Sequence, residues 1–294
     1  VTMAPNRIDP RCDLYGFCGG CQLQHITYEG QLSLKTQKVK DVIERIAHQN
    51  PDLVKPTLGP KNPWAYRNKM QMPVGGTKGD IQMGFYAMGS HDIVQGTNCP
   101  IQSEGNNSIA QACYQIAKEF DIEPYDEHTG KGVLRHVIGR IGQSGWMIIL
   151  VTATEHLPHQ EKWVEKLIER VPQVETIVHN VNGKRTNVIL GPKNSLLYGA
   201  GTITDHIKDL RFTLSPHSFF QVNPEQTTVL YDQALAYADL KGTEIVIDAY
   251  CGTGTISLFL AHKAKHVIGI EIVEPAIINA RENARRNGYD NTEF

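Results

Sequence analysis

The segment Ile245-Val-Ile-Asp-Ala-Tyr-Cys-Gly-Thr-Gly-Thr-Ile-Ser257 carries the strongest fold signal in the chain. Its apolar start predicts a strand, and its glycines predict a tight turn that leads directly into a helix. The elements predicted in this region are a helix at 224–238, a strand at 244–249, a turn at 251–254, a helix to 262, a strand at 265–270 and a helix at 275–287. Strands and helices that alternate in this way predict a parallel, doubly wound α/β sheet of the Rossmann type.

Acidic residues stand on both sides of the glycine turn. Asp248 ends the first strand, and Glu271 follows the second, where a carboxylate can accept hydrogen bonds from ribose hydroxyls. A nicotinamide fingerprint would have a third glycine in place of Ser257, and Asp248 would repel a pyrophosphate. A cationic ligand with a ribose and no phosphate suits this pattern, so we predict S-adenosylmethionine. The residues predicted to bind it are Asp248, Gly252, Gly254 and Glu271. The alternative is that Asp248 caps the turn and Glu271 is a solvated strand end.

The parallel sheet is incomplete within the sequence. Two strands cannot bury both faces of a parallel sheet, and a third strand would be running at Phe294, the last residue. Either the sequence is a fragment, with residues 216–294 the N-terminal part of a Rossmann-like domain that is truncated at its C-terminus, or this region is not independently stable.

Before residue 216 the pattern of strands and helices is mixed. Residues 1–50 contain a loop rich in cysteine and glycine and a helix at 28–48, which Asn50-Pro51 stops. Residues 51–215 predict a central α+β domain with a largely antiparallel sheet. Its predicted strands are 69–73, 81–86, 133–142, 146–152, 174–182 and 210–214, and its predicted helices are 106–120 and 159–170.

The composition is typical of a globular protein. Of the 294 residues, 40% are hydrophobic and 20% are charged, and the mean hydropathy is −0.31. The longest apolar runs have the length of strands, and residues 1–11 lack the apolar core of a signal peptide. We therefore expect a cytoplasmic protein that does not bind a membrane. The 29 Lys and Arg residues against 31 Asp and Glu residues give a net charge of −2, so an RNA would have to bind to local patches.

Four of the six cysteines form a pattern typical of a metal centre. Cys12, Cys18 and Cys21 surround the flexible pair Gly19-Gly20, and Cys99 stands far downstream before a proline. Four thiolates suit tetrahedral zinc or a [4Fe-4S] cluster equally well on spacing alone. The other interpretation is that these are unrelated reduced thiols, with Cys99 an ordinary core residue. The gap of five residues after Cys12 disfavours a radical-type S-adenosylmethionine enzyme, whose first gap would be shorter.

Further motifs run through most of the chain. They are Cys-x5-Cys-Gly-Gly-Cys-Gln-x-Gln-His at 12–25, Tyr-Arg-Asn-Lys-Met at 66–70, Gly-Phe-Tyr at 84–86, Ser-His-Asp-Ile-Val at 90–94, Asn-Cys-Pro at 98–100, Leu-Arg-His at 134–136, Ser-Phe-Phe-Gln-Val-Asn at 218–223 and Asp-Ala-Tyr-Cys-Gly-Thr-Gly at 248–254. With these motifs the chain resembles the RNA (uracil-5)-methyltransferases, and specifically the iron-sulfur branch that acts on 23S ribosomal RNA.

The resemblance implies a set of ligands and contacts. It implies S-adenosylmethionine as the methyl donor, a [4Fe-4S] cluster on the four cysteines in preference to zinc, and 23S ribosomal RNA in preference to transfer RNA. The cofactor contacts that it implies are Gln221, Tyr250, Thr255 and Glu271. On residue chemistry alone, Tyr250 could instead fill the core and Thr255 could cap a helix. We expect a monomer with no obligate protein partner.

The resemblance also implies the reaction, which is methylation of C5 of uridine. A thiolate adds to C6 and makes C5 nucleophilic, and a base later removes the C5 proton. The nucleophilic cysteine and the basic glutamate of the family are expected beyond Phe294, and Cys251 belongs to the cofactor turn. The alternatives are a non-catalytic iron-sulfur RNA-binding module, or another class I methyltransferase that acts on transfer RNA or a small molecule.

Basic and aromatic side chains supply candidate RNA contacts. The basic groups are Arg67 with Lys69, Arg135 with His136 and Arg140, and Lys184 with Arg185. Alternation along strand 133–142 predicts that Arg135 and His136 face opposite sides of the sheet. Phe219 and Phe220 are candidates to stack against a flipped base, or else to pack in the core. We expect the central domain and the cysteine loop to form the RNA platform, with a cluster that is structural and not redox-active.

Overall fold

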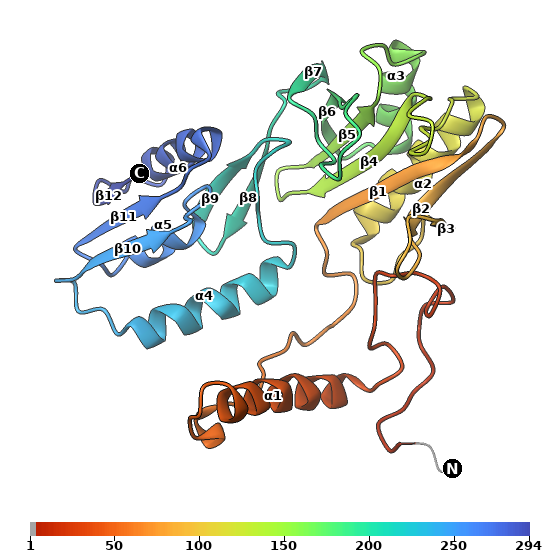
Figure 1. Ribbon diagram of the computed structural model, residues 1–294. Helices are drawn as coiled ribbons and strands as arrows, with labels where there is room; N and C mark the ends of the chain where they lie inside the picture. The colour runs from red at the N-terminus through yellow and green to blue at the C-terminus, as the bar shows by residue number, and fades with distance from the viewer. Residues whose placement is uncertain (1–3) are drawn as a thin grey trace.

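The structure, a computed structural model, describes residues 4–294 and is built around a seven-stranded sheet (Figure 1). The strand order is β3-β2-β1-β4-β5-β6-β7, and every neighbouring pair is antiparallel except β5 and β6. The bounds are β1 Lys69–Thr77, β2 Asp80–Tyr86, β3 Ile93–Gln95, β4 Leu134–Ile141, β5 Trp146–Thr152, β6 Val174–Val181 and β7 Lys193–Tyr198. The prediction of an α+β unit with a largely antiparallel sheet is confirmed.

Both faces of this sheet are covered. Helices α2 (Glu104–Glu119) and α3 (Gln160–Arg170) pack on one face and form an apolar cluster with β1, β4 and β5. A hairpin of β8 (Ile203–Ile207) and β9 (Leu210–Leu214) packs on the other face. This two-sided burial explains why β5 reads as one continuous apolar run instead of an alternating pattern.

Helix α1 stands apart from the sheets. After the cysteine loop, α1 (Tyr28–Arg45) begins at Thr27, whose hydroxyl accepts a hydrogen bond from the backbone N–H of Gly30, and a 3-10 turn at Pro51–Leu53 follows. Gly30 is the one fully buried residue of α1, and apolar side chains such as Val39 and Val42 are exposed. In Figure 1, α1 lies below α4 and away from the seven-stranded sheet.

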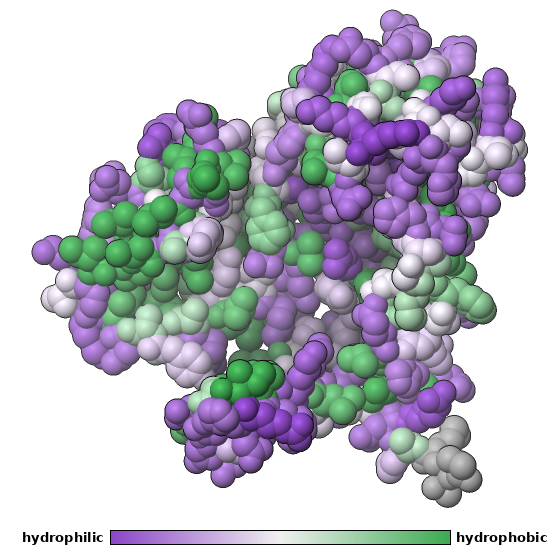
Figure 2. All heavy atoms as spheres, in the orientation of Figure 1, coloured by the Kyte–Doolittle hydropathy of each residue, from purple (hydrophilic) through white to green (hydrophobic). Residues whose placement is uncertain are grey.

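The C-terminal part is the parallel unit that the sequence predicts. Strands β10, β11 and β12 pair in parallel in that order. The bounds are α4 Pro224–Ala238, β10 Ile245–Ala249, α5 Thr255–Ala261, β11 His266–Ile270, α6 Glu274–Arg286 and β12 Thr292–Glu293. Strand β12 is the third strand expected near Phe294. Ile245, Ile247 and Ile270 expose most of their side chains, and Figure 2 shows hydrophobic residues gathered over this sheet.

The predicted domain boundary at residue 215 stays a prediction. One apolar cluster joins β4, β5 and β6 to the β8–β9 hairpin and then to α4, α5 and α6. The central sheet and the C-terminal unit therefore share a core. Within residues 4–294, no helix has the length and the apolar character needed to cross a membrane.

Candidate functional site

The turn between β10 and α5 depends on its two glycines. Gly252 and Gly254 have φ angles of +56° and +78°, which glycine adopts without steric cost. A Cβ at Gly254 would lie 3.0 Å from the Phe294 ring and 3.2 Å from the Cβ of Ala280. At Gly252, by contrast, a Cβ would meet nothing within 4 Å. The turn therefore leaves open space at Gly252, where the backbone is accessible to a ligand.

Asp248 is tied to the helix that follows the turn. Its carboxylate accepts a hydrogen bond from the hydroxyl of Ser257, which is completely buried in the first turn of α5. Burial raises the pKa of Asp248, and the hydrogen bonds from Ser257 oppose that shift. Ser257 stands where a nicotinamide fingerprint would have its third glycine. Its hydroxyl links α5 to the end of β10, which a glycine could not do.

Glu271 holds the turn from the neighbouring strand. Its Oε2 accepts from the N–H of Gly252 at 3.1 Å, and its Oε1 accepts from the N–H groups of Ile272 and Val273 at 2.8 and 3.0 Å. Hydrogen bonds from Val273, Ile272 and Gly252 lower the pKa of this carboxyl. Three of about four lone-pair positions are used, so about one further donor can be accepted. Glu271 is thus ionised, oriented and still able to bind a hydroxyl.

Tyr250 lies in the turn in an unusual conformation. Its φ is +66°, a region that bulky side chains rarely adopt, and its ring is 89% exposed. The interpretation of Tyr250 as a core-filling aromatic is therefore wrong, because the ring has no core to fill. Backbone strain of this kind, of order 1–3 kcal/mol, clusters at ligand sites.

A residue that sequence reasoning missed connects two of the predicted contacts. The hydroxyl of Tyr231, on α4, lies 2.9 Å from the hydroxyl of Thr255. Burial raises the pKa of Tyr231, and hydrogen bonds to Thr255 and to Gln221 partly oppose that shift. Gly254, not Thr255, is the N-cap residue of α5, so the interpretation of Thr255 as a cap is wrong. A single tyrosine within an amphipathic helix gives no spacing signal that would have revealed this link.

Cys251 lies in the same turn, but its thiol is a poor nucleophile. It is buried, and desolvation, with Asp248 and Glu271 nearby, raises its pKa to about 11. The thiol is therefore protonated at neutral pH, which makes it a poor nucleophile.

The four predicted metal ligands line one cavity, which is separate from the glycine turn. Cys12, Cys18, Cys21 and Cys99 all line one cavity of about 280 Å³ between the N-terminal loop and the central sheet. Within residues 4–294, no three Cys, His, Asp or Glu side chains converge closely enough to hold a single metal ion. A tetrahedral zinc needs four sulfurs about 2.3 Å from one point. The four thiols therefore share one cavity without converging on a single point.

The loop that carries three of these cysteines is positioned by backbone contacts. The N–H of Gly19 donates to the carbonyl of Tyr86 at 2.9 Å, and the N–H of Gly20 points at Cys18 Sγ at 3.4 Å. Cys99 is held separately by Asn107 of α2, which bonds both its N–H and its carbonyl. Arg67 lines the same cavity and lowers the pKa of Cys21, which burial raises overall. These groups supply positive charge and N–H donors to thiolates.

Several predicted RNA contacts are corrected by their burial. Arg135, His136 and Arg140 are at most 7% exposed, because both faces of β4 are covered and not just one. Arg135 donates to the carbonyls of Asn182 and Lys184, and Arg140 to those of Pro216 and Ser218. All three side chains are buried and are not available to RNA, and the two arginines hold backbone carbonyls.

The remaining candidates differ in their surroundings. Lys184 and Arg185 are exposed, whereas Lys69 is half-buried and burial lowers its pKa to about 8. Phe220 packs in the core beside Phe212, with ring centroids 5.7 Å apart, so it cannot stack against a flipped base. Phe219 is 68% exposed and stays a candidate for stacking.

Comparison with known proteins agrees with this geometry. Residues 240–294 match the family described as methyltransferase domain. The C-terminal unit therefore has the Rossmann-like fold of class I methyltransferases. Over its full length the chain is 49% identical to a protein named as an uncharacterized RNA methyltransferase of Halalkalibacterium halodurans, and 50% identical to another of Bacillus cereus. It spans 65% and 64% of the lengths of these two relatives.

A solved structure resembles the whole arrangement. The tRNA (uracil-54, C5)-methyltransferase of Pyrococcus abyssi, crystallised with S-adenosyl-L-homocysteine, superimposes with a TM-score of 0.77. The match covers 99% of this chain and 66% of the other, at 24% sequence identity. The likeness establishes that the central sheet, the hairpin and the Rossmann-like unit form a known combined fold.

Proposed function

We propose that this chain is part of an RNA methyltransferase that uses S-adenosylmethionine to methylate C5 of uridine in 23S ribosomal RNA. The observation that carries the proposal is the open glycine turn with Asp248 and Glu271 on either side, in a unit that matches a methyltransferase domain. The full-length similarity to RNA methyltransferases supports RNA as the substrate class. The choice of uridine C5 and of 23S ribosomal RNA depends on the motif resemblance.

The residues of the turn fit the proposed cofactor. When bound, S-adenosylmethionine supplies a methyl group activated by a positively charged sulfur. Glu271 has capacity for one ribose hydroxyl, and Gly252 presents its backbone next to open space. Tyr250 offers an uncovered ring for stacking. Tyr231 links Gln221 to Thr255, which holds the segment before α4 against the start of α5.

The uracil chemistry needs a thiolate that the turn does not provide. Cys251 is protonated at neutral pH, Cys113 is completely buried, and the other four cysteines line the separate cavity. We propose that the nucleophile comes from a part of the protein outside residues 4–294, as the resemblance implies. The relatives are longer than this chain, which leaves room for that contribution.

The cysteine cavity fits a [4Fe-4S] cluster in this proposal. Cys12, Cys18, Cys21 and Cys99 would hold it, and the cluster would lock the N-terminal loop to the central sheet. Arg67 would offset the negative charge of the thiolates. Because the cavity is distinct from the glycine turn, we propose a structural role for the cluster, and no step of the methyl transfer runs through it.

Titration of S-adenosylmethionine into the full-length protein tests the cofactor site. We expect Glu271→Gln to weaken binding by about tenfold to a hundredfold, because a hydrogen bond to a carboxylate contributes about 1.5–3 kcal/mol. Glu274→Gln, three residues further on and exposed, is the matched control and should leave the affinity unchanged. Isothermal calorimetry measures both. An absence of heat with the wild-type protein would refute the site, and equal affinities for the two variants would refute the role of Glu271.

Methyl transfer to defined RNAs tests the reaction. We expect the full-length protein to place labelled methyl groups on uridine of a 23S ribosomal RNA transcript, and not on transfer RNA. Binding to that transcript should weaken steeply with added salt, because phosphate contacts release counterions. Salt-sensitive binding without methyl transfer would favour the RNA-binding module, and methylation of transfer RNA alone would overturn the ribosomal target. Methylation of a small molecule, with no RNA affinity, would overturn both.

A further inference from the structure

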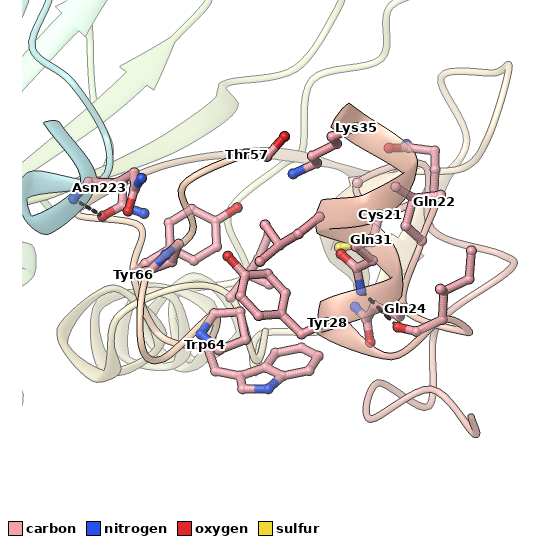
Figure 3. Close-up of a pocket in the computed structure, with 18 of the residues that line it drawn as sticks. Cys21, Gln22, Gln24, Tyr28, Gln31, Lys35, Thr57, Trp64, Tyr66 and Asn223 are labelled. Atoms are coloured by element: carbon pink, nitrogen blue, oxygen red, sulfur yellow. Dashed lines mark hydrogen bonds between the residues drawn. The ribbon is translucent and has the colours of Figure 1, made fainter. Parts of the chain in front are cut away.

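A second pocket lies beside the cysteine cavity and has no part in the site described above. Its volume is about 540 Å³, and it is bounded by the start of α1, the cysteine loop and residues 57–66 (Figure 3). Gly20, Cys21 and Gln24 line both this pocket and the cysteine cavity. On its far side the pocket reaches Asn223 and Gln226 at the start of α4. It therefore borders both the cysteine loop and the methyltransferase unit.

Three aromatic side chains line the pocket. Tyr28 projects from the first turn of α1, and Trp64 and Tyr66 project from the segment that leads into β1 (Figure 3). Each of them is partly exposed, so their faces are accessible. Gly59 lets Tyr28 take this position, because a Cβ there would lie 2.4 Å from the tyrosine hydroxyl. Burial, and to a smaller extent Tyr66, raises the pKa of Tyr28.

Three polar groups of the pocket are free to bind a ligand, whereas Gln24, Gln31 and Asn223 are engaged in hydrogen bonds. Within residues 4–294, the hydroxyls of Tyr28 and Tyr66 have no hydrogen-bond partner, and the ammonium group of Lys35 forms no ion pair. Figure 3 shows Lys35 directed from α1 toward the pocket. A second cation, Arg11, lies over the Trp64 ring at 5.1 Å from its centroid. The pocket thus combines flat apolar faces, hydrogen-bonding edges and positive charge.

We infer that this pocket takes one unstacked nucleobase of the RNA substrate, at a position separate from the base that is methylated. The inference rests on the proposed function, since it assumes an RNA substrate. Proteins read single-stranded RNA by stacking bases on aromatic rings and bonding their edges. The volume is within the usual range for small-ligand pockets. Trp64 and the two tyrosines would supply stacking and edge contacts, and Lys35, which lines the pocket, would face an adjoining phosphate.

The cysteine loop forms a wall that separates the nucleobase pocket from the cysteine cavity. Gly20 and Cys21 shape the nucleobase pocket on one side and the cysteine cavity on the other. A group that fixes the four cysteines would therefore also fix one wall of the RNA pocket. The pocket would anchor an RNA loop while its target uridine binds at the methyltransferase unit.

Tryptophan fluorescence tests the inference. The chain has three tryptophans, of which Trp163 is completely buried and Trp146 packs beside α2, so RNA should quench mainly Trp64. We expect Trp64→Phe to remove the quenching and keep most of the affinity. Trp64→Ala should weaken binding of a 23S ribosomal RNA fragment by about fivefold to a hundredfold. Tyr237→Ala, which removes an aromatic ring that is 71% exposed on α4, is the control and should bind like the wild type.

RNA with single abasic sites identifies the base. We expect one abasic position to weaken binding to the wild-type protein and to have no further effect on Trp64→Ala. Unchanged affinity in Trp64→Ala, with no quenching of Trp64, would overturn the pocket while RNA binding itself persists. A wild-type protein that binds no RNA would instead overturn the proposed function, so the two failures are distinguishable.

Discussion

Replacing Cys99 with serine is expected to remove the proposed iron-sulfur cluster from the full-length protein. Cys99 comes from a distant part of the sequence, yet it lines the same cavity as Cys12, Cys18 and Cys21. With three thiolates left, the cluster would lose one of its four ligands. We expect protein purified without oxygen to lose about four iron atoms per chain and its brown colour. Iron and sulfide analysis and the visible absorption spectrum measure the loss.

The fold itself should tolerate this change. The backbone N–H and carbonyl of Cys99 both bond to Asn107, and serine keeps these contacts. Cys113→Ala is the control, since Cys113 is completely buried in α2 and far from the cavity lining. It should keep the iron. A colourless wild-type protein that contains zinc would contradict the cluster, and a metal-free wild type would contradict any metal role for the four cysteines.

The elements whose signals depend on a few consecutive residues can be predicted from the sequence alone. The glycine turn, the carboxylates Asp248 and Glu271, and the parallel strands around them are all found where predicted, because each depends on a few consecutive residues. The meeting of Cys99 with the N-terminal cysteines was also predicted, although only the choice of residue type and a following proline indicated it. Whether these residues bind the predicted ligands stays a prediction.

Other elements were missed because tertiary contacts override local patterns. In strand β8 every second residue is buried, and the central buried residue is Asp205, which is 7% exposed between Ile203 and Ile207. Because this residue is acidic, the sequence lacks the alternating apolar pattern that predicts a strand. Arginine is rarely buried, so the sequence predicts a surface position for Arg140, but here its guanidinium is buried and donates to backbone carbonyls. The nucleobase pocket joins segments that are far apart in the chain, so no spacing in the sequence predicts it.

Arg140→Met is expected to lower the free energy of unfolding by about 2–5 kcal/mol, because two buried carbonyl groups would lose their donor. Arg140 is 3% exposed on β4, and its guanidinium donates to the carbonyls of Pro216 and Ser218. Burial lowers its pKa to about 10, so the side chain is still charged at neutral pH and these bonds are charge-assisted. They fasten the segment that carries Gln221 to the central sheet.

Urea unfolding of the full-length protein measures this effect, and Arg211→Met is the matched control. Arg211 lies on β9 near the same segment, but its side chain is exposed, so its replacement should change the unfolding free energy by less than about 0.5 kcal/mol. Because Gln221 lies in the fastened segment, Arg140→Met should also weaken binding of S-adenosylmethionine at urea concentrations where the protein is still folded. Equal stability of the two variants would show that the bonds from Arg140 do not hold the segment. Lower stability with unchanged cofactor affinity would instead place Gln221 outside the cofactor site.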